Sequence, residues 1–318
     1  MENKAKLRIA LLSGGRSSER DVSLKSGDQV YAALDKGKYD VLRYDPKTDL
    51  QKLVADADKI DAALIILHGI HGEDGTLQGM LDLLHIPYQG SGVLGSALSM
   101  NKLAAKRAYE SAGIPTAPYA VIYKSRNTEY MGPVRSLGWP VVIKPASGGS
   151  SIGMSIAKTE DAFPAAIENG FNYDATLLIE AFIDGTEVTC AVLGNDDALT
   201  TLPLVEIVPG KGYDFFDYEA KYKPGATQEI CPARVDESIA HRVREHALKA
   251  HQALFLKGYS RSDFIIQGEN IYILETNTIP GMTPNSLFPI AAKAAGISFS
   301  ALLDRLIELA LAEHRTRK

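Results

Sequence analysis

The chain has 318 residues, a length that allows two or three domains with buried cores of ordinary size. Its formal net charge is −5, and 45% of its residues are hydrophobic against 23% charged, which is typical of a soluble globular protein. The acidic balance argues against nucleic acid or an anionic membrane as a partner, because both favour clustered Lys and Arg. We therefore expect a small-molecule partner, with no nucleic acid and no membrane.

The cysteines and the apolar runs indicate the compartment. Cys190 and Cys231 form neither a metal-type pair nor a disulfide framework, and Cys190 lies in an apolar alternation that favours simple burial. The longest unbroken apolar run, residues 62–67, is far too short to span a membrane. The charged residues 1–4 lead directly into a strand and do not resemble a signal peptide. We predict a cytoplasmic protein.

Strands and helices alternate over the first part of the chain. Apolar stretches predict strands and helical spacing predicts helices, in the order strand 7–12, helix 20–34, strands 41–44 and 62–67, helix 74–84 and strand 86–88. Such alternation predicts a mostly parallel sheet. Ligands of these sheets bind at the carboxyl ends of the strands, where Gly14-Gly15 and His68-Gly69 fall.

The rest of the chain combines helices with short strands. Helices are predicted at 96–112, 237–254 and 298–313, and strands at 141–143, 177–180, 187–193, 204–208, 261–266 and 270–274. In the last helix the apolar face consists of Leu302, Leu303, Leu306 and either Leu309 or Leu311. Residues 209–232 have no clear period, and a segment of that length is usually functional or mobile.

Acidic and amide side chains gather near one predicted hairpin. If the two strands that flank Gln267-Gly268 pair, Asp263 and Glu275 lie on adjacent strands, and Asn277 shares the face of Glu275. Two carboxylates and an amide oxygen are hard ligands suited to Mg²⁺ that bridges nucleotide phosphates. A solvated sheet edge with polar residues is an equally weighted alternative for these residues alone.

Arg261 lies two positions before Asp263 and therefore on the same strand face. Beside a metal and phosphates, its guanidinium would stabilise negative charge that develops on oxygen. Taken alone, a salt bridge to Asp263 or Glu275 is the better interpretation.

A second cluster begins at Lys144, which ends a predicted strand and precedes a loop of small residues, 145–153. The free backbone N–H groups of such a loop can cover a triphosphate, although glycine-rich loops often serve only as connectors. It is not a Walker loop, because no Gly-Lys-Ser/Thr ends it. The residues placed to meet an adenine and its ribose are Glu180, Ala181, Ile183 and Glu187, a weak signal by composition.

In the N-terminal part, Glu19 and His68 are the candidates for a ligand cleft. Glu19 lies just beyond Gly14-Gly15, and His68 ends a predicted strand beside glycines. Asp74 could belong to the same cleft, but we favour it as the cap of the next helix.

Taken in order, these segments resemble the D-alanine–D-alanine ligase family of the ATP-grasp superfamily. The resemblance extends over nearly the whole chain, from about residue 7 to residue 311. It rests on ordered matches at residues 14–23, 68–79, 90–94, 144–154, 218–222, 259–263 and 275–287. The stretch 275–283, Glu-Thr-Asn-Thr-Ile-Pro-Gly-Met-Thr, is highly specific.

The resemblance implies an α/β chain (α+β overall) with a three-domain ATP-grasp fold. An N-terminal parallel-sheet domain is expected at 1–96, a central ATP-grasp subdomain at 97–188, and a C-terminal subdomain at 189–318 with the metal site and a mobile loop, 209–232. The implied activity is ATP-dependent joining of two D-alanine molecules through a D-alanyl phosphate, for peptidoglycan. Two Mg²⁺ or Mn²⁺ ions and a homodimer are implied as well.

The family's functional residues carry over onto matching positions. For ATP these are Lys102, Lys144, Ser151, Glu180, Ala181, Ile183, Glu187 and Lys221. For the two metal ions they are Asp263, Glu275 and Asn277, and for D-alanine they are Glu19, His68, Arg261, Gly281, Ser286 and Leu287. The catalytic group is Glu19, Ser150, Tyr222, Arg261 and Gly281, in which the first three form a hydrogen-bonded trio that closes the site.

Two positions depart from the family pattern, which has Asp where Asn101 stands and Glu where Gly148 stands. D-alanine–D-lactate and D-alanine–D-serine ligases, or another carboxylate–amine ligase, are the alternatives within enzymes. The neutral phenol of Tyr222 favours D-alanine, because a cationic His would repel the ammonium of the second substrate. A catalytically inactive nucleotide sensor should lack a metal ligand or Arg261, and all are present.

Overall fold

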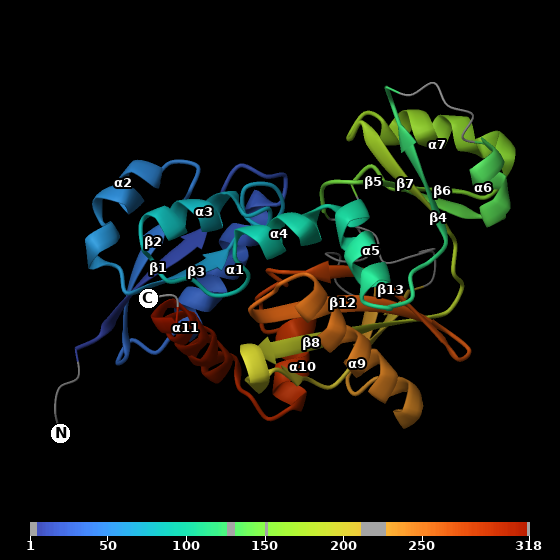
Figure 1. Ribbon diagram of the computed structural model, residues 1–318. Helices are drawn as coiled ribbons and strands as arrows, with labels where there is room; N and C mark the ends of the chain where they lie inside the picture. The colour runs from blue at the N-terminus through green and yellow to red at the C-terminus, as the bar shows by residue number, and fades with distance from the viewer. Residues whose placement is uncertain (1–4, 126–130, 150–151, 211–226, 317–318) are drawn as a thin grey trace.

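The computed structural model describes residues 5–125, 131–149, 152–210 and 227–316, and the strands within them form three sheets (Figure 1). The first sheet is parallel, in the order β2-β1-β3, as the alternation predicted. Its strands are β1 (Leu7–Ser13), β2 (Tyr39–Tyr44) and β3 (Ala62–Ile66), and the helices of this part are α1 (Arg20–Ala33), α2 (Leu50–Ala55) and α3 (Thr76–Leu83). The predicted strand at 86–88 is reduced to one parallel bridge between Tyr88 and Ala63.

The second sheet is antiparallel, in the order β4-β7-β5-β6. Its strands are β4 (Tyr119–Tyr123), β5 (Val141–Pro145), β6 (Ser155–Ala157) and β7 (Thr176–Ala181). Helices α6 (Met131–Leu137) and α7 (Phe163–Gly170) cover one face, where Ile143 and Ile179 join their core. Because side chains alternate along a strand, Lys144 and Glu180 belong to the opposite face.

The third sheet has six strands, in the order β11-β10-β8-β12-β13 with β9 beside β8. The strands are β8 (Thr186–Gly194), β9 (Thr200–Thr201), β10 (Val205–Pro209), β11 (Thr227–Ile230), β12 (Gly258–Gln267) and β13 (Asn270–Asn277). Helix α9 (Glu237–Ala253) packs on one face together with Cys190 and Phe264. The expected burial of Cys190 is thus confirmed, and burial raises the pKa of its thiol to about 12.

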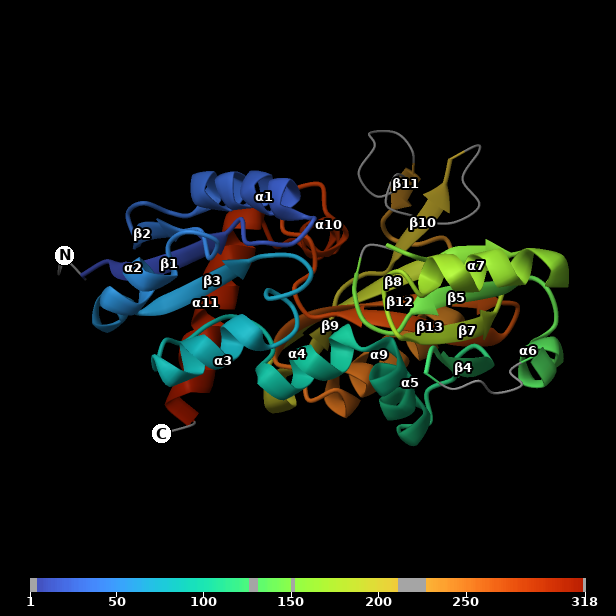
Figure 2. The same ribbon diagram turned by 90° about the horizontal axis from the view of Figure 1, so that it is seen from above.

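The other face of the third sheet meets α10 (Leu287–Ala294) and α11 (Phe299–Thr316). Figure 2 shows α11 passing next to β1 and β3, and its leucines share one core with Leu11 and Leu64 of the first sheet. The predicted apolar face is confirmed for Leu302, Leu303 and Leu306, which are buried together with Ile307, while Leu309 and Leu311 are only partly buried. The last helix therefore joins the first and third sheets.

The single helix predicted at 96–112 is wrong. The chain forms α4 (Val93–Met100) and α5 (Lys102–Ser111), and Asn101 between them is extended, with φ −97° and ψ 104°. The side-chain oxygen of Asn101 accepts a hydrogen bond of 2.9 Å from the Ala104 N–H, so this residue caps a new helix. Apolar spacing continues through the break, which is why the pattern concealed it.

The domain boundaries stay predictions. The one placed between residues 188 and 189 lies within β8, and the C-terminal helix packs against the first sheet. No helix in the described part of the chain is long and apolar enough to cross a membrane.

The position of α11 leads to a stability prediction. Leu306→Ala removes a fully packed side chain between two sheets, so the free energy of unfolding in urea should fall by about 2–5 kcal/mol. Leu94→Ala is the control, because Leu94 is 57% exposed and should change it by less than about 0.5 kcal/mol. Equal effects of the two variants would show that α11 does not hold the sheets together.

Candidate active site

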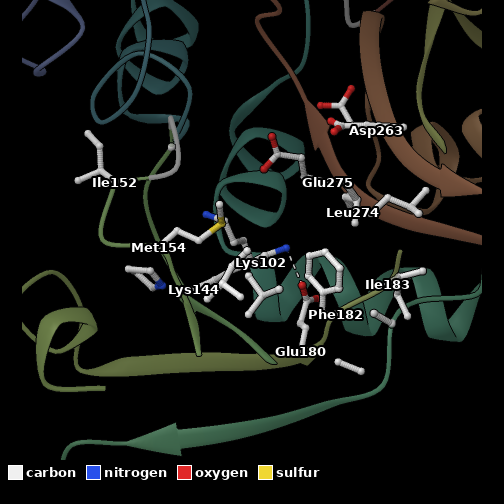
Figure 3. Close-up of a pocket in the computed structure, with 18 residues that line it drawn as sticks. Lys102, Lys144, Ile152, Met154, Glu180, Phe182, Ile183, Asp263, Leu274 and Glu275 are labelled. Carbon is white, nitrogen blue, oxygen red and sulfur yellow. Dashed lines mark ion pairs between the residues drawn. The ribbon is translucent and has the colours of Figure 1, made fainter. Parts of the chain in front are cut away.

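A cleft lies between the second and third sheets, with a volume of about 1010 Å³ when the solvent at its mouth is included. Figure 3 shows Glu180 on one side of it and the carboxylates of Asp263 and Glu275 on the other. The lining combines polar residues from both sheets with an apolar wall of Val142, Met154, Ile156, Ile265 and Leu274. A planar apolar group and an anionic group could therefore occupy it side by side.

The hairpin of β12 and β13 brings the predicted metal ligands together. The predicted hairpin is confirmed, with Asp263 and Glu275 on adjacent strands; Asp263 is paired with Glu275, and Arg261 with Asn277. The register shifts between Asp263 and Phe264, so that Leu274 is an extra residue on β13. This bulge explains why the consecutive residues Leu274 and Glu275 both line the cleft, which strict alternation does not predict.

Arg261 and Asp263 form a bidentate ion pair at the floor of this hairpin. The guanidinium Nε and Nη2 donate to the two carboxylate oxygens over 2.9 and 2.8 Å. Burial alone lowers the pKa of Arg261, but Asp263 raises it above its ordinary value, so the side chain stays cationic. The salt bridge that we considered the better interpretation of Arg261 alone is therefore present.

Two further groups hold Asp263. Thr189 on β8 donates its hydroxyl over 2.6 Å, and the Asn277 amide donates over 3.3 Å. With its NH₂ turned to Asp263, Asn277 directs its amide oxygen elsewhere, and the carboxylate of Glu275 lies on the neighbouring position of the same strand face. This all-oxygen set fits Mg²⁺ or Mn²⁺. No group of three or more His, Cys, Asp or Glu suited to a metal occurs among the described residues, so an ion here would need the amide oxygen.

On the opposite wall, Glu180 is the centre of a buried charge cluster. Its two oxygens lie 2.6 Å from Lys144 Nζ and 2.7 Å from Lys106 Nζ. Burial alone raises the pKa of Glu180, but the ammonium groups of Lys144 and Lys106 lower it to about 2. Lys106 was missed from sequence, because a Lys one helical turn after Lys102 is usually solvated. Lys102 itself donates to the Gly148 carbonyl over 2.6 Å.

The first sheet contributes the buried side chains of Glu19 and His68. Glu19 approaches two loops: a Cβ on Gly69 would lie 3.1 Å from its Oε2, and one on Gly149 would lie 3.8 Å away. Burial lowers the pKa of His68, although Glu19 acts in the opposite direction, and its Nε2 has no hydrogen-bond partner in the described part of the chain. A neutral imidazole and a carboxylate therefore face the junction of the three sheets.

Glu73 was not predicted as a site residue. It accepts a hydrogen bond of 2.6 Å from the Gly69 N–H, and burial raises its pKa to about 8. The charges of Glu19, Glu275 and Arg261 also act on its pKa, so it belongs to the same region. The sequence contains no signal for this position, because Glu73 is one acid in a glycine-rich turn. Its place in the site becomes visible only in the folded chain.

Gly281, Ser286 and Leu287 lie in the turn that leads into α10. A Cβ on Gly281 would lie 3.0 Å from the Ser286 hydroxyl, which also accepts from the Thr283 N–H over 3.2 Å. Leu287 begins α10, so its N–H belongs to a helix N-terminus. Ala181, Ile183 and Glu187 line the cleft.

Four of the predicted site residues, Ser150, Ser151, Lys221 and Tyr222, lie outside the described residues. The trio that the resemblance implies for Glu19, Ser150 and Tyr222 therefore stays a prediction, and so do the assigned roles of the other residues.

Comparison with known proteins agrees with this arrangement. The family model described as "D-ala D-ala ligase N-terminus" matches residues 45–91, and "D-ala D-ala ligase C-terminus" matches residues 108–308. The chain belongs to the D-alanine–D-alanine ligase family. Among curated members, it is 61% identical over 306 residues to the D-alanine–D-alanine ligase of Syntrophobacter fumaroxidans, covering 96% of this chain and 98% of that one. It is 55% identical to the ligase of Desulfotalea psychrophila, covering 98% of both chains.

Solved structures of the family have the same fold. The D-alanine–D-alanine ligase from Bacillus anthracis complexed with ATP matches with a TM-score of 0.86 and 34% identity, covering 98% of this chain and all of that one. A D-Ala:D-Ser ligase from Enterococcus faecalis matches with a TM-score of 0.83 and 32% identity, covering 96% of this chain and all of that one. The α/β ATP-grasp fold class expected from sequence is confirmed.

The contact between Thr189 and Asp263 leads to a second prediction. Thr189→Val keeps the shape but removes a hydrogen bond to a buried carboxylate, so in EDTA the free energy of unfolding should fall by about 1.5–3 kcal/mol. Thr200→Val is the control for a neutral acceptor, because the hydroxyl of this more exposed residue donates to the Leu193 carbonyl and its loss should cost at most about 0.5–1.5 kcal/mol. A smaller loss for Thr189→Val than for this control would contradict a charge-assisted bond.

Proposed function

We propose that the protein joins two molecules of D-alanine into D-alanyl-D-alanine for peptidoglycan, with conversion of ATP to ADP and phosphate. The observation that carries the proposal is the convergence of the Arg261–Asp263 pair, Glu275 and the Lys144–Glu180 pair on one cleft. As a member of this ligase family the protein is an ATP-dependent enzyme. A cytoplasmic location and a homodimer are further parts of the proposal.

The chemistry requires activation, because a carboxylate is a poor electrophile. The carboxylate oxygen of the first D-alanine attacks the γ-phosphorus of ATP, and ADP leaves. The amine of the second D-alanine, after loss of a proton from its ammonium, attacks the carbonyl carbon of the D-alanyl phosphate. Phosphate then leaves as the peptide bond forms. Acyl phosphates hydrolyse readily, so water must be excluded during the reaction.

The nucleotide lies between the second and third sheets in this proposal. Lys144 and Lys102 bind its phosphates, Ser151 and Lys221 add to them, and the strand from Glu180 to Ile183 meets the adenine while Glu187 meets the ribose. The apolar wall of the cleft suits a purine ring. Asp263, Glu275 and Asn277 would hold two Mg²⁺ ions, which neutralise negative charge on the phosphates.

The D-alanine molecules lie at the junction with the first sheet. Glu19, with His68, takes the ammonium of the first, and the turn at Ser286 and Leu287 takes the carboxylate of the second. A carboxylate is favoured at the start of α10, where backbone N–H groups have no partner within the helix. Arg261 and the Gly281 N–H stabilise the oxyanion of the tetrahedral intermediate.

The segment 209–232 is proposed to close over the site, with Tyr222 reaching Ser150 and Glu19. The predicted bounds are too wide, because Pro209 ends β10 and Thr227–Ile230 form β11, and these two strands are paired in the third sheet. Residues 211–226 between them, with Tyr222, lie outside the described residues.

The activity test is release of phosphate from ATP that depends on D-alanine. We expect it in the presence of Mg²⁺ and not in EDTA, with D-alanyl-D-alanine as the main product by mass when D-serine and D-lactate compete at pH 6 and pH 8. A phenol is ordinarily neutral at both pH values, so Tyr222 gives no reason to expect a shift toward D-lactate at low pH. No release would exclude the ligase, and a mainly D-serine or D-lactate product would exclude the proposed second substrate.

Arg261 should act on the transition state more than on substrate binding. Arg261→Lys keeps the charge but loses the planar fork, so kcat should fall roughly 10²- to 10³-fold with little change in KM. Arg234→Lys is the control, because Arg234 forms a similar two-bond pair with Glu206 away from the cleft lining and should leave kcat unchanged. A rise in KM for ATP at constant kcat would instead make Arg261 a ground-state phosphate ligand.

A further inference from the structure

Lys106 is a buried cation that the proposed reaction does not use. Only 4% of the residue is exposed, and it does not line the cleft, although its partner Glu180 does. It lies on α5, and its ammonium is 2.7 Å from Glu180 Oε1 and 3.0 Å from the Ala117 carbonyl oxygen that accepts from it. The ring of Tyr119 covers it, with the centroid 4.8 Å from Nζ. Lys106 is therefore held by a carboxylate, a backbone carbonyl and an aromatic ring, and it does not line the cleft itself.

The cluster has two ammonium groups and one carboxylate. Lys144 and Lys106 each contact a different oxygen of Glu180, so the three side chains together carry one net positive charge. Without Lys106, Lys144 and Glu180 would form a neutral pair. A triphosphate would then have to compete with a buried carboxylate for Lys144, in surroundings where that attraction is strong.

Binding of a nucleotide would also change the partners of Glu180, which makes a second cation beside it more important. When Lys144 turns from Glu180 toward a phosphate, Glu180 loses one of its two partners. Glu180 is only 3% exposed, and an unpaired buried carboxylate is strongly destabilising. Lys106 itself does not line the cleft, so it can stay beside Glu180 while Lys144 turns, and the carboxylate keeps a cation throughout.

We propose that Lys106 is a positioning residue that balances Glu180 and thereby leaves Lys144 available to the phosphates of the nucleotide. The inference rests on the proposed ATP site and deepens it. A role of this kind has a specific signature: loss of Lys106 weakens binding of the phosphates and spares binding of the nucleoside.

The test compares the affinities of the enzyme for adenosine and for an ATP analogue with a non-transferable γ-phosphate, both with Mg²⁺, by calorimetry. For Lys106→Met, the dissociation constant of the analogue should rise roughly 10- to 100-fold, in line with removal of one partner from a buried charge pair. That of adenosine should stay within about threefold, because Glu180 and the apolar wall are unchanged. Equal weakening of both ligands would indicate general damage to the cleft and would overturn the proposal, as would no change in either.

A double variant restores the charge balance. Lys106→Met with Glu180→Gln leaves Lys144 as the only charge, so the net charge equals that of the parent and no carboxylate competes. The affinity for the ATP analogue relative to that for adenosine should return to within about threefold of the parent value, since the charge that the phosphates meet is the same. This variant also keeps the test decisive if Lys106→Met alone fails to fold, because it has no buried carboxylate at position 180. If the double variant binds the analogue as weakly relative to adenosine as Lys106→Met does, the proposal is overturned.

Two controls separate the possible failures. Lys257→Met breaks an ion pair with Glu313 that is not part of the cleft lining, and it should leave both affinities unchanged. If the parent enzyme itself fails to bind the analogue, the proposed function is wrong. If the parent binds it and Lys106→Met binds it equally tightly, only the role of Lys106 is wrong.

Discussion

Strand β12 is hydrogen-bonded along both edges, to β8 and to β13, and most of the site depends on this pairing. Phe264 packs into the core beneath α9, so its neighbours Asp263 and Ile265 must face the cleft. A slip of one residue would put Phe264 into the cleft and Asp263 into the core, and both changes are unfavourable. The same burial that stabilises the sheet therefore fixes where Arg261 and Asp263 present their charges.

Both walls of the cleft keep their charges in pairs before any ligand arrives. On one wall Arg261 forms two hydrogen bonds with Asp263, and on the other Glu180 lies between two lysines. Desolvation makes a lone buried charge costly, so in the proposed site an anionic nucleotide would meet groups that exchange partners rather than groups without any. Binding then requires little reorganisation of the protein, which is what electrostatic preorganisation demands of a catalytic site.

Local patterns in the sequence predicted the parts of the structure that local patterns control. The Gln267-Gly268 turn predicted that Asp263 and Glu275 lie on adjacent strands, and the leucine spacing predicted the buried face of α11. What the sequence did not reveal depends on tertiary contacts: the bulge at Leu274, the helix break at Asn101, and the burial of Lys106. At each of these positions the local sequence is equally compatible with a regular strand, a continuous helix or an exposed side chain. Packing between distant segments decides which of them forms.

The two departures from the family pattern have a local structural account. Asn101 caps α5 through its oxygen, as an Asp would, and its NH₂ donates to the Ser147 hydroxyl over 3.3 Å. An Asp could not make this second bond, because an ionised carboxylate only accepts. Gly148 has a φ of +106°, which a side chain would strain, and its carbonyl accepts from Lys102. The start of the loop proposed to cover the phosphates is thus attached to α5 through Asn101 and Lys102, by a neutral amide and a backbone carbonyl rather than by an acidic side chain.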